Sequence, residues 1–179
     1  MDAALTSANV AAGAPSPASL ARPSLAGPRT REVLVFEVAD QTYGLPTVDV
    51  REIVRAVTIT PLPNAPAVIE GVVNVRGQVL PVLDIRARFR LPSRSLDPSD
   101  HLIVASAGPR GVILRVDRAT HLAQIDEASI QPAETLGANA TYVAGVAKLD
   151  DGLLLIHDLT SFFSAAEAFS LDQALRAPP

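Results

Sequence analysis

The sequence contains no cysteine among its 179 residues. Without cysteine the chain can form no disulfide, thiolate nucleophile or thiolate metal site, and this composition is compatible with a reducing compartment. Aromatic residues make up only 4% of the chain, and the formal net charge is −4. Nucleic-acid-binding proteins need a basic surface to neutralise phosphates, and many stack bases on aromatic side chains. The composition therefore argues against a nucleic-acid partner, including one bound by an OB-fold or SH3-like barrel.

The chain also lacks any run of about 20 apolar residues, the length that a membrane-spanning helix requires. Its N-terminus does not follow the signal-peptide pattern, because Asp2 replaces the usual positive charge and polar residues interrupt the apolar segment. We therefore expect a cytoplasmic protein with no direct membrane insertion. Residues 1–29 are rich in Ala, Pro, Ser and Gly. Such a segment cannot bury enough apolar surface to offset its ordering entropy, so it is predicted to be a flexible tail.

Hydrophobic residues make up 48% of the chain, enough for a full core. The most informative stretch is Ile69–Ile85, in which two short apolar segments flank Arg76 and Gly77. Gly77 permits positive φ, so the pattern predicts a β-hairpin with a tight turn. Pro81 lacks a backbone donor, so its strand should lie at an edge or a bulge. The pattern recurs without a gap at Gly145–Leu159, which predicts a duplicated β subdomain.

The remaining apolar segments are short and separated by turn residues, which is typical of strands. Further strands are predicted over residues 33–38, 42–45, 58–60, 101–107, 111–117 and 119–125. A short helix is predicted over Thr47–Ile53 with Thr47 as its N-cap, and one helical turn over Arg86–Phe89 capped by Asp84. An amphipathic helix is predicted over Ser164–Arg176. The fold class is therefore all-β with a few short helices, arranged as small closed or partly closed barrels.

The sequence offers no catalytic or metal-binding motif. Its three histidines are far apart and none has ligand spacing, and His157 is most simply a structural or surface residue. Asp84 and Asp158 end the two hairpins at equivalent positions, where a carboxylate most simply caps the following turn. The hypothesis that stays open is a hydrolase that uses one of these carboxylates. We expect no enzyme, no catalytic residue, no metal and no cofactor.

The run from Gly71 to Ile85, G-V-V-N-V-R-G-Q-V-L-P-V-L-D-I, resembles the signature of the CheW-like domain, the domain of bacterial chemotaxis coupling proteins. Further resemblance lies in Tyr43-Gly44, Val50–Ile53, Tyr142–Gly145 and the closing segment Leu153–Leu159. The similar region spans residues 31–176, which is most of the chain.

The resemblance implies two five-stranded SH3-like β-barrel subdomains packed around a shared hydrophobic core, plus a C-terminal helix. The expected organisation is a tail over residues 1–29, a CheW-like domain over 30–163, and a C-terminal helix and tail over 164–179. It also implies a non-enzymatic adaptor that joins the cytoplasmic tip of methyl-accepting chemoreceptors to the regulatory domain of a histidine kinase. The alternative is a coupling protein of a non-flagellar chemosensory system, with type IV pilus, developmental or second-messenger output.

In this family the receptor tip docks in a groove between the subdomains, and the matching positions here are Val50, Glu52, Ile53 and Arg76. From the residues alone, Arg76 is equally consistent with a solvated turn and with a guanidinium that binds a partner's carboxylate. The second hairpin carries Asp150 at the same place. Opposite charges at equivalent turns favour a partner contact for Arg76.

The chain departs from the family pattern at three positions. Val75 replaces the usual leucine of the N-L-R-G motif, Ile113 replaces a usual glycine, and Arg115 replaces a usual apolar residue. The change at Ile113 leaves the geometry of its strand open. A charge at Arg115 must reach solvent or a partner, since a buried unpaired charge is strongly unfavourable. The long N-terminal tail has no explanation in the resemblance.

Overall fold

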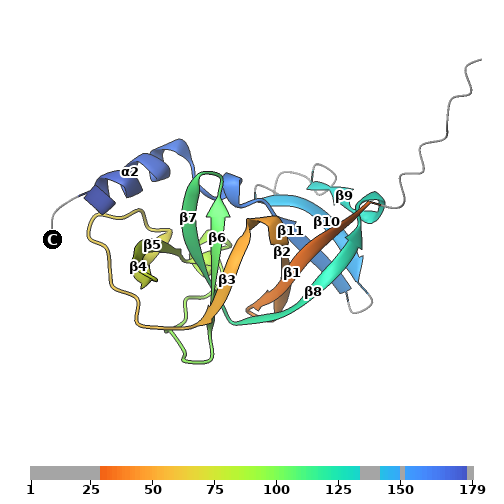
Figure 1. Cartoon of the computed structure of the whole chain (residues 1–179), viewed down its shortest axis with the longest axis horizontal. Coiled ribbons are helices and arrows are strands. Elements are labelled where there is room, and N and C mark those ends of the chain that lie inside the picture. Colours follow the sequence, from red (N-terminus) through yellow and green to blue (C-terminus); the bar gives the residue numbers. More distant parts are fainter. Residues whose placement is uncertain (1–28, 134–141, 150–151, 177–179) are drawn as a thin grey trace, which may run out of the picture.

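The computed structural model describes residues 29–133, 142–149 and 152–176. The predicted tail lies outside these residues except for Arg29. The described chain forms two curved sheets that lie side by side, with a helix packed on one of them (Figure 1). No helix of the described residues is both long enough and apolar enough to cross a bilayer.

The first sheet, called subdomain 1 below, has five long strands and a two-residue edge strand. Their order is β8-β1-β2-β11-β10-β9. The strands are β1 (Thr30–Val38), β2 (Gln41–Pro46), β8 (Arg118–Asp126), β9 (Gln131–Pro132), β10 (Val143–Leu149) and β11 (Gly152–His157). The second sheet, subdomain 2, has the order β3-β6-β7-β5-β4. Its strands are β3 (Val50–Arg55), β4 (Ile69–Val75), β5 (Gln78–Leu83), β6 (His101–Ala107) and β7 (Arg110–Val116).

The helices are short apart from the last one. They are η1 (Thr47–Asp49), α1 (Ile85–Arg88), η2 (Glu127–Ser129), η4 (Leu159–Phe162) and α2 (Ala165–Arg176). The predicted fold class is confirmed: the protein is all-β with a few short helices, in two SH3-like barrel subdomains plus a C-terminal helix.

The duplication predicted from the two hairpins is confirmed in detail. The hairpin β4–β5 lies in subdomain 2 and β10–β11 in subdomain 1, and each carries a register shift just before its glycine, Gly71 or Gly145. Strand β5 then pairs in parallel with β7, as β11 does with β2. A Cβ on Gly71 would lie 2.3 Å from the backbone oxygen of Thr60, and one on Gly145 would lie 2.5 Å from Cγ2 of Ile130. Both positions therefore require glycine for the same steric reason.

The two subdomains exchange one strand each. Strand β3 follows β2 of subdomain 1 in the chain but pairs with β6 of subdomain 2, and β8 follows β7 of subdomain 2 but pairs with β1. Both exchanged strands contain a bulge, at Arg51 in β3 and at Thr120 in β8. Each sheet is thus completed by chain that comes from the other, and the repeat covers β1–β3 and β6–β8 as well as the hairpins.

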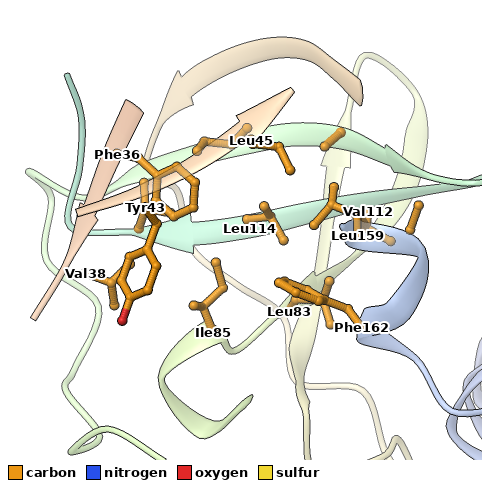
Figure 2. Packing of buried hydrophobic residues seen from close by; sticks show 14 of the residues in the cluster. Phe36, Val38, Tyr43, Leu45, Leu83, Ile85, Val112, Leu114, Leu159 and Phe162 are labelled. Carbon is orange, nitrogen blue, oxygen red and sulfur yellow. The ribbon is translucent and has the colours of Figure 1, made fainter. Parts of the chain in front are cut away.

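Three clusters of buried apolar side chains fill this architecture. Each barrel has its own cluster, Val33, Val35, Ile125, Ala147, Leu154 and Ile156 in subdomain 1, and Val73, Leu80, Val82, Leu102, Val104 and Ile113 in subdomain 2. The largest cluster, the central core, lies between the subdomains. Figure 2 shows its members Phe36, Val38, Tyr43, Leu45, Leu83, Ile85, Val112, Leu114, Leu159 and Phe162. Burying one large apolar side chain contributes about 1.5–3 kcal/mol, so the central core is a major stabilising contact between the two halves.

The helix predicted over Thr47–Ile53 is wrong. Only Thr47–Asp49 forms a single 3-10 turn, and the chain then extends as β3. Thr47 is not an N-cap; its hydroxyl donates to the backbone oxygen of Glu32 at 3.2 Å. Valine and isoleucine have modest helix propensity and fit strands well, so pairing with β6 prevails over the local helical pattern. The strand predicted over residues 58–60 is also wrong, because only Thr60 forms an isolated bridge, with Val72.

The cap predicted at Asp84 is confirmed. Asp84 caps α1 by accepting a hydrogen bond from the backbone nitrogen of Ala87 at 3.0 Å. The prediction that the strand of Pro81 lies at an edge or a bulge is wrong, because β5 is an inner strand between β7 and β4 and Pro81 pairs in register with Val72. The pairing of β5 with β7 covers only Val82 and Leu83, so Pro81 still lies beside an unpaired flank. This is where a residue without a backbone donor is tolerated.

Helix α2 begins one residue later than predicted and is held by polar contacts at its start and middle. Ser164 and Glu167 form a capping box, in which the Ser164 nitrogen donates to the Glu167 carboxylate at 2.9 Å and the Glu167 nitrogen donates to the Ser164 hydroxyl at 3.2 Å. Arg88 and Arg110 of subdomain 2 pair with acidic residues of the helix. Together with the buried Leu171, these contacts attach α2 to the fold.

Candidate docking site

The turn of the first hairpin presents Arg76 to solvent. Arg76 and Gly77 both have positive φ, 51° and 87°, which is the geometry of a two-residue type I′ turn. The Asn74 side chain supports the turn by accepting a hydrogen bond from the Gly77 nitrogen at 2.8 Å. The Arg76 side chain is 82% exposed. Its counterpart Asp150 in the second hairpin lies outside the described residues, so the comparison of the two turns stays a sequence argument.

Arg76 forms an ion pair with Glu52, and the two atoms Nη2 and Oε2 are 2.7 Å apart. Glu52 lies on β3 and Arg76 at the end of β4, and these strands are the two edges of the subdomain 2 sheet. The ion pair therefore joins the two edge strands of subdomain 2, and this place is called the barrel seam below. Exposed pairs of this kind contribute about 0–1 kcal/mol, so a partner's carboxylate could compete for the guanidinium at little energetic cost.

Val50 and Ile53 lie on the other face of β3. They are three residues apart and would point to opposite faces in a regular strand, but the bulge at Arg51 brings both to one side. Val50 is partly buried against the central core, whereas Ile53 is 40% exposed. Of the four predicted residues, the structure thus brings Arg76 and Glu52 into contact, makes Val50 a packing residue, and leaves Ile53 as the accessible apolar side chain.

Leu122 was missed by the sequence analysis. It lies on β8, the strand exchanged in the opposite direction, and is 58% exposed. Leu122 pairs with Leu34, and Ile53 pairs with Ile103, and both of these partners belong to the central core. Because directly paired residues point to the same face of a sheet, Leu122 and Ile53 are equivalent apolar positions that face the region between the subdomains. Extending the repeat from the hairpins to β1–β3 and β6–β8 would have identified it.

A partly buried ionic network holds the linker that precedes β6. The carboxylate of Asp117 accepts hydrogen bonds from Arg86 at 2.6 Å, from the Ala39 nitrogen at 2.8 Å and from Arg94 at 2.8 Å. Arg94 also pairs with the buried Asp100. Burial would raise the pKa of Asp117, but these hydrogen bonds prevail and lower it to about 2. All the charges are matched within the network, so it serves the fold rather than a ligand.

The departures at Ile113 and Arg115 are accommodated inside subdomain 2. Strand β7 pairs with β6 along its whole length without a register shift, so Ile113 does not disturb it, and its side chain is fully buried in the barrel. The charge of Arg115 reaches a partner, because its Nε lies 3.1 Å from Oε2 of Glu70. Its Nη2 also donates to the backbone oxygen of Arg94 at 3.0 Å. The charge is therefore compensated internally rather than by solvent.

The two carboxylates considered for hydrolysis are both caps. Asp84 caps α1, and Asp158 accepts hydrogen bonds from the Thr160 nitrogen at 2.9 Å and from its hydroxyl at 2.7 Å. A cavity of about 470 Å³ lies between α2 and the β6–β7 turn, lined by Arg110, Phe163 and mostly small residues. Neither carboxylate lines it. The capping interpretation of both residues is thus confirmed, and the described site favours docking over hydrolysis.

Comparisons with known proteins agree with this geometry. The CheW-like domain family matches residues 32–167. "Chemotaxis protein CheW" of Rhizobium meliloti is 32% identical over 139 residues, covering 76% of this chain and 90% of the relative. "Protein FrzA" of Myxococcus xanthus is 35% identical over 117 residues, covering 65% and 73%. The crystal structure of scaffolding protein TtCheW from Thermoanaerobacter tengcongensis superposes with a TM-score of 0.71 at 33% identity, covering 78% of this chain and 96% of that one.

Proposed function

Since this chain belongs to the CheW-like domain family, we propose that it is a non-enzymatic adaptor that couples methyl-accepting chemoreceptors to a histidine kinase. The receptor's cytoplasmic tip docks between the subdomains, and the regulatory domain of the kinase binds the same protein. The observation that best supports this proposal is that the two faces of β3 present different groups. One face of this edge strand offers the exposed Ile53, and the other offers Glu52 paired with Arg76. The adaptor works in the cytoplasm and uses no cofactor.

The docking site combines two kinds of recognition. Leu122 and Ile53 supply apolar area on the face toward the region between the subdomains. The Arg76 guanidinium supplies charge at the rim, where electrostatic contacts set orientation and association rate more than affinity. Signalling contacts of this kind are small and transient, with less than about 1,200 Å² of total buried surface.

The first prediction concerns charge at the rim. Replacing Arg76 with glutamate is expected to lower kinase activation in a reconstituted receptor–kinase assay about tenfold, which corresponds to about 1.4 kcal/mol of lost coupling. The matched control is Arg90→Glu, because Arg90 is also exposed and also has positive φ, 57°. Circular dichroism should show that both variants stay folded. Wild-type activation with Arg76→Glu would remove Arg76 from the site.

The double variant Glu52→Arg/Arg76→Glu separates the two interpretations of Arg76. If the residue only closes the barrel seam, exchanging the two charges restores the ion pair and the activity. If a partner's carboxylate binds the guanidinium, the exchanged pair stays inactive. We expect the second result.

The second prediction concerns the apolar face. Ile53→Asp is expected to weaken binding of a receptor-tip fragment at least tenfold, because it places a charge in a contact that excludes water. The control is Val57→Asp, since Val57 is similarly exposed at 49% but follows the strand. Binding is measured by titration calorimetry, and thermal unfolding verifies that both variants keep the wild-type Tm. Equal affinity for the two variants would place the receptor elsewhere.

A second candidate function is coupling in a non-flagellar chemosensory system. Relatives do not all carry the chemotaxis name, since one of the similar proteins is called "Protein FrzA". A pull-down with candidate kinases and receptor tips distinguishes the two, because the kinase that is captured identifies the pathway.

A further inference from the structure

His157 ends β11 in the junction between the two subdomains and is only 2% exposed. Its ring stacks on Phe89 with 4.7 Å between the centroids, and it lies 5.3 Å from the Tyr43 ring and 5.6 Å from the Phe162 ring. Phe89 follows α1 of subdomain 2, whereas Tyr43 and His157 belong to strands of subdomain 1. Figure 2 shows Tyr43 and Phe162 within the central core. The imidazole is therefore a member of an aromatic cluster that joins the subdomains.

The hydrogen bonding of His157 suits only its neutral form. Nδ1 lies 2.7 Å from the backbone oxygen of Tyr142, so this nitrogen carries the proton and donates. Nε2 is buried and has no hydrogen-bond partner among the described residues. Protonation would place a new N–H donor and a positive charge at that atom. A buried donor without an acceptor and a buried charge without a counter-ion are both strongly unfavourable.

A positive charge lies against the Tyr142 side of the cluster. The Arg88 guanidinium of α1 lies 5.1 Å from the centroid of the Tyr142 ring and donates to the hydroxyl of Tyr142 at 3.1 Å. It also pairs with Glu167 of α2 at 3.1 Å. Within residues 29–133, 142–149 and 152–176, no carboxylate forms an ion pair with His157.

The other titratable groups around the cluster are already engaged. The carboxylate of Asp158 is used to cap η4. Arg86 of α1 pairs with Asp117 at 2.6 Å. The Tyr43 phenol stays neutral, because burial raises its pKa more than Arg86 lowers it. Among the described residues, none of these groups forms an ion pair with His157.

We propose that protonation of His157 opens this aromatic cluster and so loosens the junction between the two subdomains in mildly acidic solution. Attraction between an imidazolium and the faces of Phe89 and Tyr43 would oppose the opening. Burial prevails over the hydrogen bond to Tyr142 and lowers the pKa of His157 to about 4. In the opened state the ring titrates near its ordinary pKa of about 6.5. The closed junction is therefore fully stable above about pH 6.5, and it loses stability as the pH falls from there toward 4.

Only one of the two hairpins, β10–β11, ends in this titratable residue. Leu83 ends β5 at the position equivalent to His157, and its side chain is 1% exposed in the same central core. Leucine therefore suits this place in the fold and cannot titrate. His157→Leu is the substitution that removes the proton-binding group while keeping an apolar side chain at the junction.

The experiment follows the packing of the aromatic cluster through the circular dichroism signal of its tyrosines. The chain has two tyrosines and no tryptophan, and Tyr43 and Tyr142 both contact Phe89 in this cluster. Near-ultraviolet circular dichroism of the full chain is recorded from pH 8 to pH 3.5, with far-ultraviolet circular dichroism for the sheets. In the wild type we expect the tyrosine signal to fall between about pH 6.5 and 4, while the far-ultraviolet signal is kept over most of that range.

His157→Leu is expected to keep the tyrosine signal to a pH about one unit lower than the wild type, because leucine binds no proton and so removes the driving force for opening. The control His121→Leu changes an exposed histidine of β8 and should follow the wild type. If His157→Leu does not fold, His157→Gln serves instead, because glutamine does not titrate. A wild-type signal that is flat down to pH 4, or equal midpoints for the wild type and the His157 variants, would overturn the proposal.

A second measurement follows the ring itself. In proton–carbon NMR spectra of the wild type, the histidine signal that is missing from the His157 variant should titrate with a midpoint well below the ordinary value of about 6.5. A midpoint near the ordinary value of about 6.5 would show that the ring accepts a proton without opening the cluster, and would also overturn the proposal. Neither measurement involves a receptor or a kinase, so this inference can fail or stand independently of the adaptor function.

Discussion

Replacing Phe162 with alanine is expected to lower the free energy of unfolding by about 3–5 kcal/mol, the usual loss when a buried phenylalanine is truncated. The Phe162 side chain is 2% exposed in the central core and makes edge contacts with the rings of Tyr142 at 5.5 Å and Phe89 at 5.9 Å. Truncation would remove an aromatic ring that contacts residues of both subdomains. Domains of this size unfold with about 5–15 kcal/mol, so the variant would be close to the limit of folding.

Phe169→Ala is the matched control for this variant. Phe169 lies on α2 and is 64% exposed, so the same chemical change should shift stability by no more than about 0.5 kcal/mol. Urea denaturation followed by far-ultraviolet circular dichroism gives both values from the transition midpoints. A loss for Phe162→Ala as small as that for Phe169→Ala would mean that the central core does not hold the subdomains together.

Glu70→Leu is expected to destabilise the fold by about 3 kcal/mol, because it leaves the charge of Arg115 without a counter-ion. The Arg115 side chain is 7% exposed and that of Glu70 is 26% exposed, so water replaces the lost carboxylate only partly. Burial raises the pKa of Glu70 more than Arg115 lowers it, which shows that the carboxylate itself is in a poorly solvated position. The Arg94 backbone oxygen still accepts from Arg115, but it cannot neutralise the charge.

The double variant Glu70→Leu/Arg115→Leu is expected to recover most of this loss. A well-packed apolar pair often equals or exceeds a buried ion pair in stability. A double-mutant cycle measured by urea denaturation gives the coupling energy directly. Additive losses for the two single substitutions would show that the ion pair is not coupled, and that solvent rather than Glu70 compensates Arg115.

Local sequence patterns predicted the hairpins because their determinants are contiguous in the chain. Gly77 follows Arg76 in a turn that needs positive φ, and apolar segments of strand length stand on both sides. The capping roles of Asp84 and Asp158 are equally local, since each carboxylate accepts from a nitrogen within three residues. Such features depend on residues that are adjacent in the sequence, so they can be predicted from a short motif alone.

The helix predicted over Thr47–Ile53 failed for the opposite reason. Its residues show a mixed apolar pattern that is consistent with either state, and the decision depends on β6, about fifty residues further along the chain. Once β3 forms, the bulge at Arg51 decides that Ile53 faces the region between the subdomains. A bulge cannot be located from one sequence, so the orientation of the candidate side chains on β3 could not be predicted.

The sequence by itself determined the family, the all-β class and the duplication of the hairpins. The docking roles of its candidate residues stay a proposal. Tertiary structure alone decided that β3 and β8 are exchanged and that Arg76 pairs with Glu52. It also decided that Leu122 and Ile53 face the region between the subdomains, and that His157 lies in an aromatic junction. The physical reason is the same in each case. Turn geometry and strand period are set by neighbouring residues, whereas pairing partners and burial are set by contacts between residues far apart in the chain.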